Sequence, residues 1–362
     1  MASIIRRARP RRAMRAASSS PRVARARAPP AYRRAVAARL CARGVSSRSA
    51  LARGADDGDP FAFADPSPPL ARPRVVYEDD ESLALDKPPG ASFHGDDLEH
   101  GRPGVLALTR ALQREGLLEG TEYAGDLHAV HRLDKLTSGI LLLAKRRDVA
   151  AALAREFRER RVVKVYVALT ARRPKKKMGT VRGVMTRARR GAWKLERGDA
   201  MASSGHSSGR SPSPPRGEAV TKFVSRGIAG GGGASGRPSR PLRLMTLRPL
   251  TGKTHQLRVA CKSLGAPILG DARYADKTEA EREDRGYLHA AAMRLAVPSQ
   301  TNAFADGGGA RRIVEIVCRP SVGAEWGTDA FQSAWEEMGL EDSDVWFPES
   351  PLLRSTRAEL LT

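Results

Sequence analysis

Short apolar runs separated by turn residues dominate the chain between residues 74 and 347. Runs that are rich in Val, Leu and Ile and bounded by Gly, Pro or Asp are typical of β-strands. We expect strands over 74–79, 82–86, 140–144, 162–169, 180–185, 192–195, 219–224, 242–249, 288–297 and 312–317.

Other segments carry apolar residues at helical spacing. They predict helices over 105–113, 148–160, 254–264 and 328–338. Asp148 and Thr254 are the expected N-caps of the second and third helices, and Gly265 is the expected stop of the third. Many strands of antiparallel type with a few helices predict an α+β domain.

The third predicted helix has two distinct faces. Its apolar stripe consists of Leu257, Cys261 and Leu264. A second face, at i, i+3 and i+7, carries His255, Arg258 and Lys262. Such a polar face is either solvated or lines a cleft, and its place between two core strands favours a cleft.

The ends of the chain and two internal segments lack these patterns. Residues 56–73 are rich in Asp, Ala and Pro and predict an unstructured linker, and residues 348–362 predict a tail. Gly, Ser and Pro dominate 198–217 and 227–241, which we interpret as flexible insertions at hairpin loops. Residues 74–347 are therefore expected to form one folded domain.

The formal charge of +23 is distributed unevenly. Residues 1–55 hold 15 arginines, no lysine and no acid, which leaves +8 for the remainder. An Arg-rich, Ser-rich and acid-free segment is typical of an organellar transit peptide, and the alternative is a basic arm that binds nucleic acid. The absence of lysine favours the transit peptide, so we expect a chloroplast or mitochondrial location.

The three cysteines, Cys41, Cys261 and Cys318, form no CxxC motif. We therefore expect neither a disulfide framework nor a metal site. No apolar run is long enough to cross a bilayer, so no membrane contact is expected.

The stretch 131–145, HRLDKLTSGILLLAK, changes from polar to apolar at its midpoint. A Thr-Ser-Gly turn leads into a buried strand, and that strand would hold Asp134 rigidly beside Arg132. An acid next to an arginine stays ionised, which suits a nucleophile or a general base. The alternative is a structural Asp–Arg pair at the start of a strand.

The segment HRLDKLTSG resembles the signature loop H-R-L-D-x-x-T-S-G of the RluA-type pseudouridine synthases. Between Val75 and Val297, similar segments follow the family's order: VVYEDDESLALDKPPG, KVYVAL, PLTGKTHQLRVACKSLGAPILGDARY and YLHAAAMRL. The resemblance implies the pseudouridine synthase fold, a mixed and mostly antiparallel sheet with flanking helices and a central RNA cleft. It also implies a catalytic domain, residues 74–347, that isomerises uridine in RNA without cofactor or metal.

The resemblance further implies a role for individual residues. Asp134 would be the catalytic aspartate, Arg258 would pair with it, and Tyr166 would lie against the flipped uracil. Arg132 would fill the gap that the base leaves. The other substrate-binding candidates are His131, Lys253, His255 and Leu288. Lys253 stands where the family more often has Arg, and lysine lacks the bidentate fork of a guanidinium.

The remaining positive charge fits RNA as the partner, because phosphate contacts dominate such binding. The expected backbone contacts include Arg158, Arg161, Lys175, Lys176 and Lys177. Neutralising these residues together with Arg155 and Arg160 should weaken RNA binding and flatten its salt dependence. A solvated loop is the alternative for the run 172–177.

The leading hypothesis is a monomeric, organellar enzyme acting on ribosomal or transfer RNA. The second is a non-catalytic RNA-binding or ribosome-assembly factor on the same fold. A glycoside hydrolase would need a second carboxylate near Asp134, and Asp271, in a predicted turn, is the candidate closest in motif terms.

Overall fold

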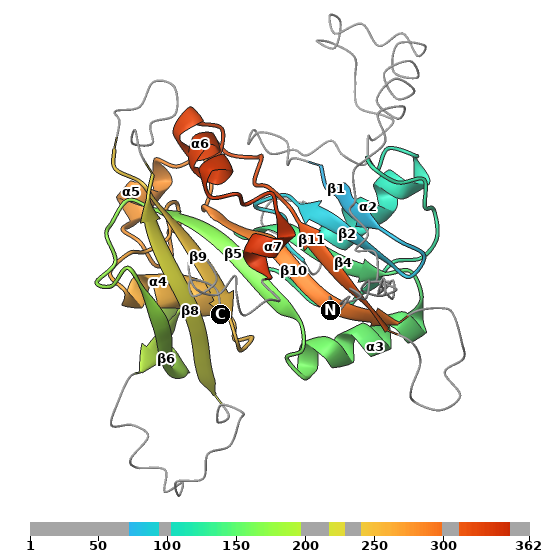
Figure 1. Cartoon of the computed structure of the whole chain (residues 1–362), viewed down its shortest axis with the longest axis horizontal. Coiled ribbons are helices and arrows are strands. Elements are labelled where there is room, and N and C mark those ends of the chain that lie inside the picture. Colours follow the sequence, from blue (N-terminus) through green and yellow to red (C-terminus); the bar gives the residue numbers. More distant parts are fainter. Residues whose placement is uncertain (1–71, 94–102, 197–216, 229–239, 299–310, 348–362) are drawn as a thin grey trace, which may run out of the picture.

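One eleven-stranded sheet organises the computed structural model, which describes residues 72–93, 103–196, 217–228, 240–298 and 311–347. The strand order is β1–β2–β4–β10–β5–β9–β8–β6–β7, with β11 paired to β10 and β3 paired to β4 (Figure 1). Among these named strands β4 and β10 run parallel, and the other pairs are antiparallel. The predicted α+β class with a mixed, mostly antiparallel sheet is confirmed.

The elements follow the predicted order closely. The strands are β1 (Arg74–Glu78), β2 (Ser82–Lys87), β3 (His128–Ala129), β4 (Ser138–Ala144), β5 (Val163–Thr170), β6 (Met178–Arg187), β7 (Trp193–Glu196), β8 (Glu218–Gly227), β9 (Arg243–Pro249), β10 (Leu288–Pro298) and β11 (Arg311–Val317). The helices are α2 (Val105–Arg114), α3 (Arg147–Arg158), α4 (Gln256–Ser263), α5 (Lys277–Glu281), α6 (Asp329–Glu337), α7 (Ser343–Trp346) and the 3₁₀ turn η1 (Arg189–Gly191). The pattern of the chain did not predict the shortest elements, β3, η1, α5 and α7.

Two predicted helix caps are wrong. Asp148 lies within the first turn of α3 and binds the guanidinium of Arg146, the residue at the N-cap position. The N-cap of α4 is His255 in a left-handed conformation (φ 58°), one residue beyond Thr254. Gly265, with φ 75°, follows the C-cap of α4 as predicted, because glycine adopts positive φ without a steric cost.

The Gly-rich segments connect strands in different ways. β8 and β9 pair antiparallel, so the segment 227–241 joins the strands of a hairpin as expected. β7 and β8 both pair with β6, one on each side, so the prediction that 198–217 is a hairpin loop is wrong. Nearly all of both segments lies outside the described residues, as do the predicted transit peptide, most of the 56–73 linker and the 348–362 tail.

The two faces of the sheet are covered by different elements, and β5 shows the division. Val165, Val167 and Leu169 pack against an aromatic cluster from the α6–α7 region, Trp326, Phe331, Trp335 and Trp346. Tyr166 and Ala168 point to the opposite face, where α4 packs over β5, β8 and β9. Alternate residues of a strand face opposite sides, so one strand contributes to both layers. The candidate active site lies on the α4 face.

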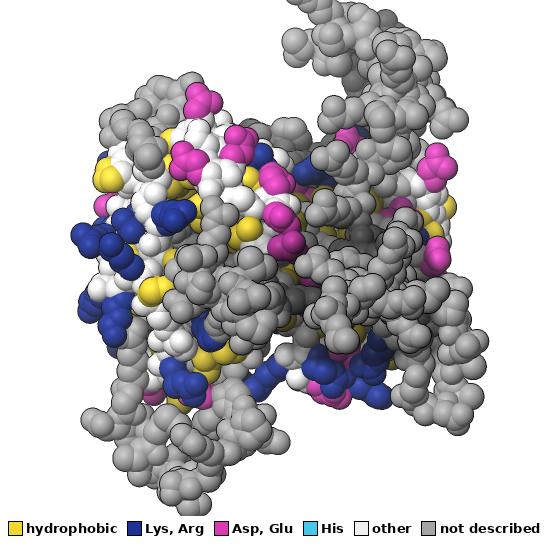
Figure 2. Space-filling view, viewed as in Figure 1, with side chains coloured by type: hydrophobic (Ala, Val, Ile, Leu, Met, Phe, Trp, Pro, Cys, Tyr) yellow, Lys and Arg dark blue, Asp and Glu magenta, His cyan; other side chains and the backbone are white. Residues whose placement is uncertain are grey.

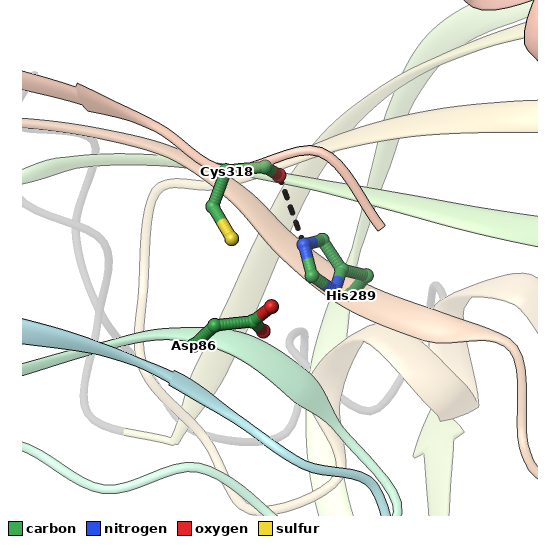
Figure 3. Close-up of side chains that lie close together, drawn as sticks. All are labelled: Asp86, His289 and Cys318. Atoms are coloured by element: carbon green, nitrogen blue, oxygen red, sulfur yellow. Dashed lines mark hydrogen bonds between the residues drawn. The ribbon is translucent and has the colours of Figure 1, made fainter. Parts of the chain in front are cut away.

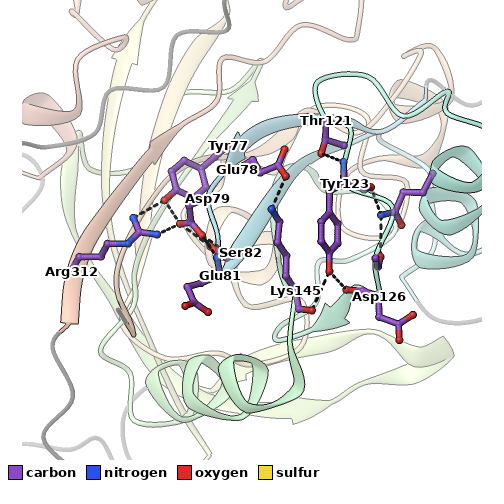
Figure 4. Close-up of polar contacts among 12 residues, drawn as sticks. Tyr77, Glu78, Asp79, Glu81, Ser82, Thr121, Tyr123, Asp126, Lys145 and Arg312 are labelled. Carbon is purple, nitrogen blue, oxygen red and sulfur yellow. Dashed lines mark hydrogen bonds and ion pairs between the residues drawn. The ribbon is translucent and has the colours of Figure 1, made fainter. Parts of the chain in front are cut away.

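The acidic turn between β1 and β2 is structural (Figure 4). Asp79 accepts from the backbone N–H of Glu81 and Ser82, at 2.8 and 2.6 Å, and also binds Tyr77 and Arg312. Because Arg312 belongs to β11, this network ties the first hairpin to the last strand.

Among the helices of the described part of the chain, none combines the length and the apolar character that crossing a bilayer requires.

Candidate active site

Asp134 lies half-buried in the loop that leads into β4. The loop closes in a turn in which the N–H of Thr137 donates to the carbonyl of Asp134 at 3.0 Å. The carbonyl of Lys135 accepts from Gly90 N at 2.8 Å and from Lys87 Nζ at 3.4 Å. The KPPG segment that follows β2 therefore holds the Asp134 loop in place.

Gly139 allows the sheet to close directly beside this loop. Its φ is 98°, and a Cβ at this position would clash with the carbonyl oxygen of Ala290. At this point β4 and β10 pair, with Ser138 opposite His289 and Gly139 opposite Ala290. The glycine thus brings the start of β10 next to the Asp134 loop.

One cavity of about 440 Å³ collects most of the predicted site residues. Those that line it are His131, Arg132, Asp134, Arg158, Tyr166, Lys253, His255, Arg258 and Leu288. The volume falls within the usual range of ligand pockets. Arg161 and Lys175–Lys177 do not line the cavity.

Arg258 is not directly paired with Asp134, which corrects the sequence-based prediction. Its Nε and Nη2 donate to the two carboxylate oxygens of Asp271, each at 2.7 Å. Asp271 is fully buried whereas Asp134 is half exposed, so Asp271 is the carboxylate that needs a close cation. Burial opposes the Arg258 charge, but the hydrogen bonds and charge of Asp271, with a smaller contribution from Asp134, raise its pKa.

The bidentate contact also orients the guanidinium. With Nε and Nη2 bound to Asp271, Nη1 is the nitrogen that Asp271 leaves for other partners. Asp134 lines the same cavity and lies close enough for its charge to act on Arg258. Arg258 therefore places a fixed positive charge near Asp134 without neutralising it in a direct ion pair.

The polar face of α4 converges on Tyr274. The Tyr274 hydroxyl is hydrogen-bonded to His255 Nδ1 at 2.8 Å and accepts from the N–H of Trp193 at 2.9 Å. Arg258 and Lys262 lie over the Tyr274 ring, 5.0 and 5.7 Å from its centroid. The predicted grouping of His255, Arg258 and Lys262 is confirmed, and a buried tyrosine organises it.

Tyr166 and His131 are both uncharged at neutral pH. Burial, followed by the charge of Asp134, raises the pKa of the Tyr166 hydroxyl above its usual value. Burial and then the charge of Lys164 lower the pKa of His131 to about 3. His131 Nε2 accepts from the N–H of Leu142 at 2.9 Å, and its ring stacks on Phe157 at 4.5 Å. His131 thus joins the Asp134 loop to β4 and α3 through contacts within the protein.

Lys164 and Gln256 also line the cavity, although no role at the site was predicted for either. Lys164 Nζ lies 5.5 Å from the centroid of the Phe157 ring, and burial lowers its pKa. Its spacing of two from Tyr166 was an available signal, because such residues share a strand face. Gln256 accepts from Thr251 Oγ1 at 2.8 Å and from Lys253 N at 3.0 Å, and so shapes the loop before α4. Its role had no signal in the sequence beyond its place in THQLR.

The predicted RNA-backbone residues fall into three groups. Arg158 lines the cavity at the end of α3. Arg161 is engaged by Glu156, at 2.7 and 2.8 Å, and by Glu159, so other anions would have to compete for it. Lys175, Lys176 and Lys177 are exposed between β5 and β6. On the face shown in Figure 2, basic side chains gather near α3 and over the β6–β8 edge, and acidic ones gather near α6.

Several known proteins are similar to this chain in sequence. The family model described as RNA pseudouridylate synthase matches residues 81–263. An uncharacterized RNA pseudouridine synthase of Haemophilus influenzae is 37% identical over 252 residues, covering 70% of this chain and 89% of that protein. The ribosomal large subunit pseudouridine synthase C of Rickettsia prowazekii is 31% identical over 236 residues, 64% of this chain and 67% of that protein.

Among solved structures, human RNA pseudouridylate synthase domain containing 1 has a TM-score of 0.48 at 23% identity, over 74% of this chain and 86% of that one. The family model covers half of the chain, and the Haemophilus relative matches 70% of it at 37% identity. The chain therefore belongs to the RNA pseudouridylate synthase family and is an isomerase.

Proposed function

We propose that this protein converts specific uridines to pseudouridine in organellar ribosomal or transfer RNA, with Asp134 as the catalytic group. One observation carries the proposal: Asp134, Tyr166 and Arg258, from three distant parts of the chain, line the same cavity. Names of relatives such as ribosomal large subunit pseudouridine synthase C favour ribosomal RNA over transfer RNA. The Arg-rich, acid-free segment 1–55 supports an organellar location.

The proposed reaction breaks the bond between ribose and N1 of uracil, rotates the ring and rejoins it through C5. A stacked base must first leave the helix, because its reacting atoms are otherwise out of reach. Arg132, which is exposed at the cavity, would occupy the gap in the stack. Tyr166 and Leu288 would hold the extruded ring, with the protonated phenol adding no charge beside Asp134.

Asp134 would either attack the anomeric carbon of the ribose or remove a ribose proton to give a glycal. Both routes need a carboxylate that is charged and partly shielded from water. Arg258 would supply that environment, since its charge is fixed by Asp271 and remains close to Asp134. Lys164 and Arg158 add positive charge to the same cavity, which suits the flanking phosphates of the substrate.

The catalytic role is tested by Asp134→Asn and tritium release from RNA labelled at uridine C5. The variant should lose at least about 10²–10⁴-fold in rate while still binding RNA. Asp126→Asn, which changes an exposed carboxylate outside the cavity, serves as the matched control. Equal rates in Asp134→Asn and wild type would leave a non-catalytic RNA-binding factor as the better explanation.

The substrate and compartment are tested by mapping pseudouridines in organellar RNA with and without the protein. Loss of one or a few pseudouridines in ribosomal RNA is the expected result. Unchanged organellar maps, with a change in nuclear-encoded RNA instead, would contradict the organellar part of the proposal and leave the chemistry intact.

A further inference from the structure

A second cavity, of about 130 Å³, lies across the sheet from the candidate active site. Leu288 and Thr137 line the active-site cavity, whereas the next residues along the chain, His289 and Ser138, line the second one. Neighbouring residues of extended backbone point to opposite faces of a sheet. The β4–β10 pair, with Ser138 opposite His289, therefore separates the two cavities.

The second cavity has an excess of positive charge. Four basic side chains and a single carboxylate, Asp86, line it; the basic residues are Arg72, Arg74, Lys87 and Arg285. Asp86 already accepts from Arg74 at 3.4 Å. Arg72 and Arg74 are exposed to solvent, whereas Lys87 is fully buried and Arg285 is partly enclosed. Charges in enclosed positions are normally paired with an opposite charge, so Lys87 and Arg285 are the two cations that matter here.

The two most enclosed cations are bound by neutral groups. Lys87 Nζ donates to the carbonyls of Pro88 and Ala91, at 2.8 and 2.9 Å. Arg285 donates to the carbonyl of Val322 and to the Ser138 hydroxyl, both at 2.7 Å. These contacts satisfy the N–H groups but do not balance the two positive charges. Within the described ranges, neither cation forms an ion pair with a carboxylate.

The perturbed pKa values agree with this excess. Burial, followed by the charge of Arg285, lowers the pKa of Lys87 to about 7. Burial also lowers the pKa of Arg285 to about 10, although Tyr287, Asp284 and Asp86 act in the opposite direction. An anion in the cavity would stabilise the charged form of both residues.

A metal ion fits this place less well, although Asp86, His289 and Cys318 converge there within 4.8 Å (Figure 3). His289 Nε2 donates to the carbonyl of Cys318 at 2.9 Å, so Nδ1 is the acceptor for the Ser138 hydroxyl at 2.8 Å. Burial and the charge of Asp86 raise the pKa of the Cys318 thiol. The imidazole lone pair is thus occupied, the thiol is protonated, and the surrounding cations repel a metal.

We propose that the second cavity is a binding site for a phosphate group. The volume admits one such group, and Arg74, Arg285 and Ser321 at its lining can donate to phosphate oxygens. Binding there would act on the Asp134 loop, because Arg285 holds Ser138 and Lys87 holds the Lys135 carbonyl. The phosphate is either free in solution or part of an RNA backbone, and the second case rests on the proposed function.

The first test measures thermal unfolding of the full chain in increasing inorganic phosphate, with KCl added to keep the ionic strength constant. The melting temperature of the wild type should rise saturably, by about 2–4 °C. Arg74→Gln, with a side chain that is 48% exposed, should lose this rise, and so should Ser321→Glu, which places a negative charge at an exposed lining position. Arg172→Gln, 54% exposed and likewise paired with a carboxylate, should keep it.

The second test measures RNA affinity of the same variants with and without phosphate. If the RNA backbone is the source, Arg74→Gln weakens binding about tenfold more than Arg172→Gln, and phosphate competes with RNA. If free phosphate is the source, the two variants bind RNA equally, and phosphate still raises the melting temperature of the wild type but not that of Arg74→Gln.

Three results would overturn the site. They are the absence of any phosphate-specific shift, a shift that survives both Arg74→Gln and Ser321→Glu, and Co²⁺ binding that produces a thiolate absorption band lost in Cys318→Ser. The thermal unfolding measurement does not depend on catalysis. A protein that lacks isomerase activity can therefore be distinguished from one that does not bind phosphate in the second cavity.

Discussion

Arg258 and Arg285 lie on opposite sides of the same pair of strands and are treated differently by the fold. Arg258 is held by the buried carboxylate of Asp271, and its pKa is raised. Arg285 is held by backbone carbonyls and a serine hydroxyl, and its pKa is lowered to about 10. Arg258 is therefore a cation paired with a buried carboxylate, whereas Arg285 is a cation that forms no ion pair with a carboxylate of the described residues.

Stability measurements should separate the two arginines most clearly. Arg258→Met leaves Asp271 buried without its cation and should cost about 3–5 kcal/mol in the free energy of unfolding. Arg285→Met leaves carbonyls and a hydroxyl without a donor and should cost about 1–3 kcal/mol. Urea unfolding measures both.

The double variant Arg258→Met/Asp271→Leu is the control for the charge explanation. It removes both members of the ion pair and should recover much of the loss. A loss that is the same for Arg258→Met and Arg285→Met, with no recovery in the double variant, would contradict the distinction between the two sites.

Asp271→Asn sharpens the comparison on the catalytic side. The amide keeps the shape of the contact but removes the charge that fixes Nε and Nη2 of Arg258, so the Arg258 charge is no longer held in one position near Asp134. We expect kcat in the tritium-release assay to fall about 10–100-fold with little change in KM, as for groups that orient a catalytic partner. A change confined to KM would indicate a role in RNA binding instead.

The pH dependence of stability extends the comparison to two buried histidines, His131 near the Asp134 loop and His289 at the second cavity. His131 and His289 have folded-state pKa values of about 3 and about 4, below the usual value of 6.5 for the unfolded chain. Below pH 6.5 the unfolded state binds protons that the folded state excludes, so stability falls as the pH drops from 6.5 towards 4. Each histidine contributes a slope of about 1.4 kcal/mol per pH unit.

His289→Gln tests the contribution from the second cavity. Glutamine can donate to the Cys318 carbonyl and accept from Ser138, but it does not titrate. Urea unfolding of this variant should show a flatter pH profile between 6.5 and 4. A slope equal to that of the wild type would mean that His289 already exchanges protons freely in the folded state.

The pattern of apolar residues was sufficient to predict every strand longer than two residues, because a period of two or a short buried run has few alternatives. Helix starts were predicted less well. Thr254 and Asp148 are good capping residue types, but the backbone before α4 instead adopts a left-handed conformation at His255, and Asp148 binds Arg146. Tertiary contacts decide which of several adjacent polar residues ends up at a cap.

The sequence by itself determined the residue types of the candidate active site and their spacing within each motif, because HRLD, KVY and THQLR each occupy one local element. Only the tertiary structure decided which carboxylate Arg258 binds. Asp134 and Asp271 are both within reach of its charge, and burial selected Asp271 because a fully buried carboxylate has no water to replace its partner. The second cavity likewise has no linear signature, since Lys87, Ser138 and Arg285 meet only where β2, β4 and β10 come together in the sheet.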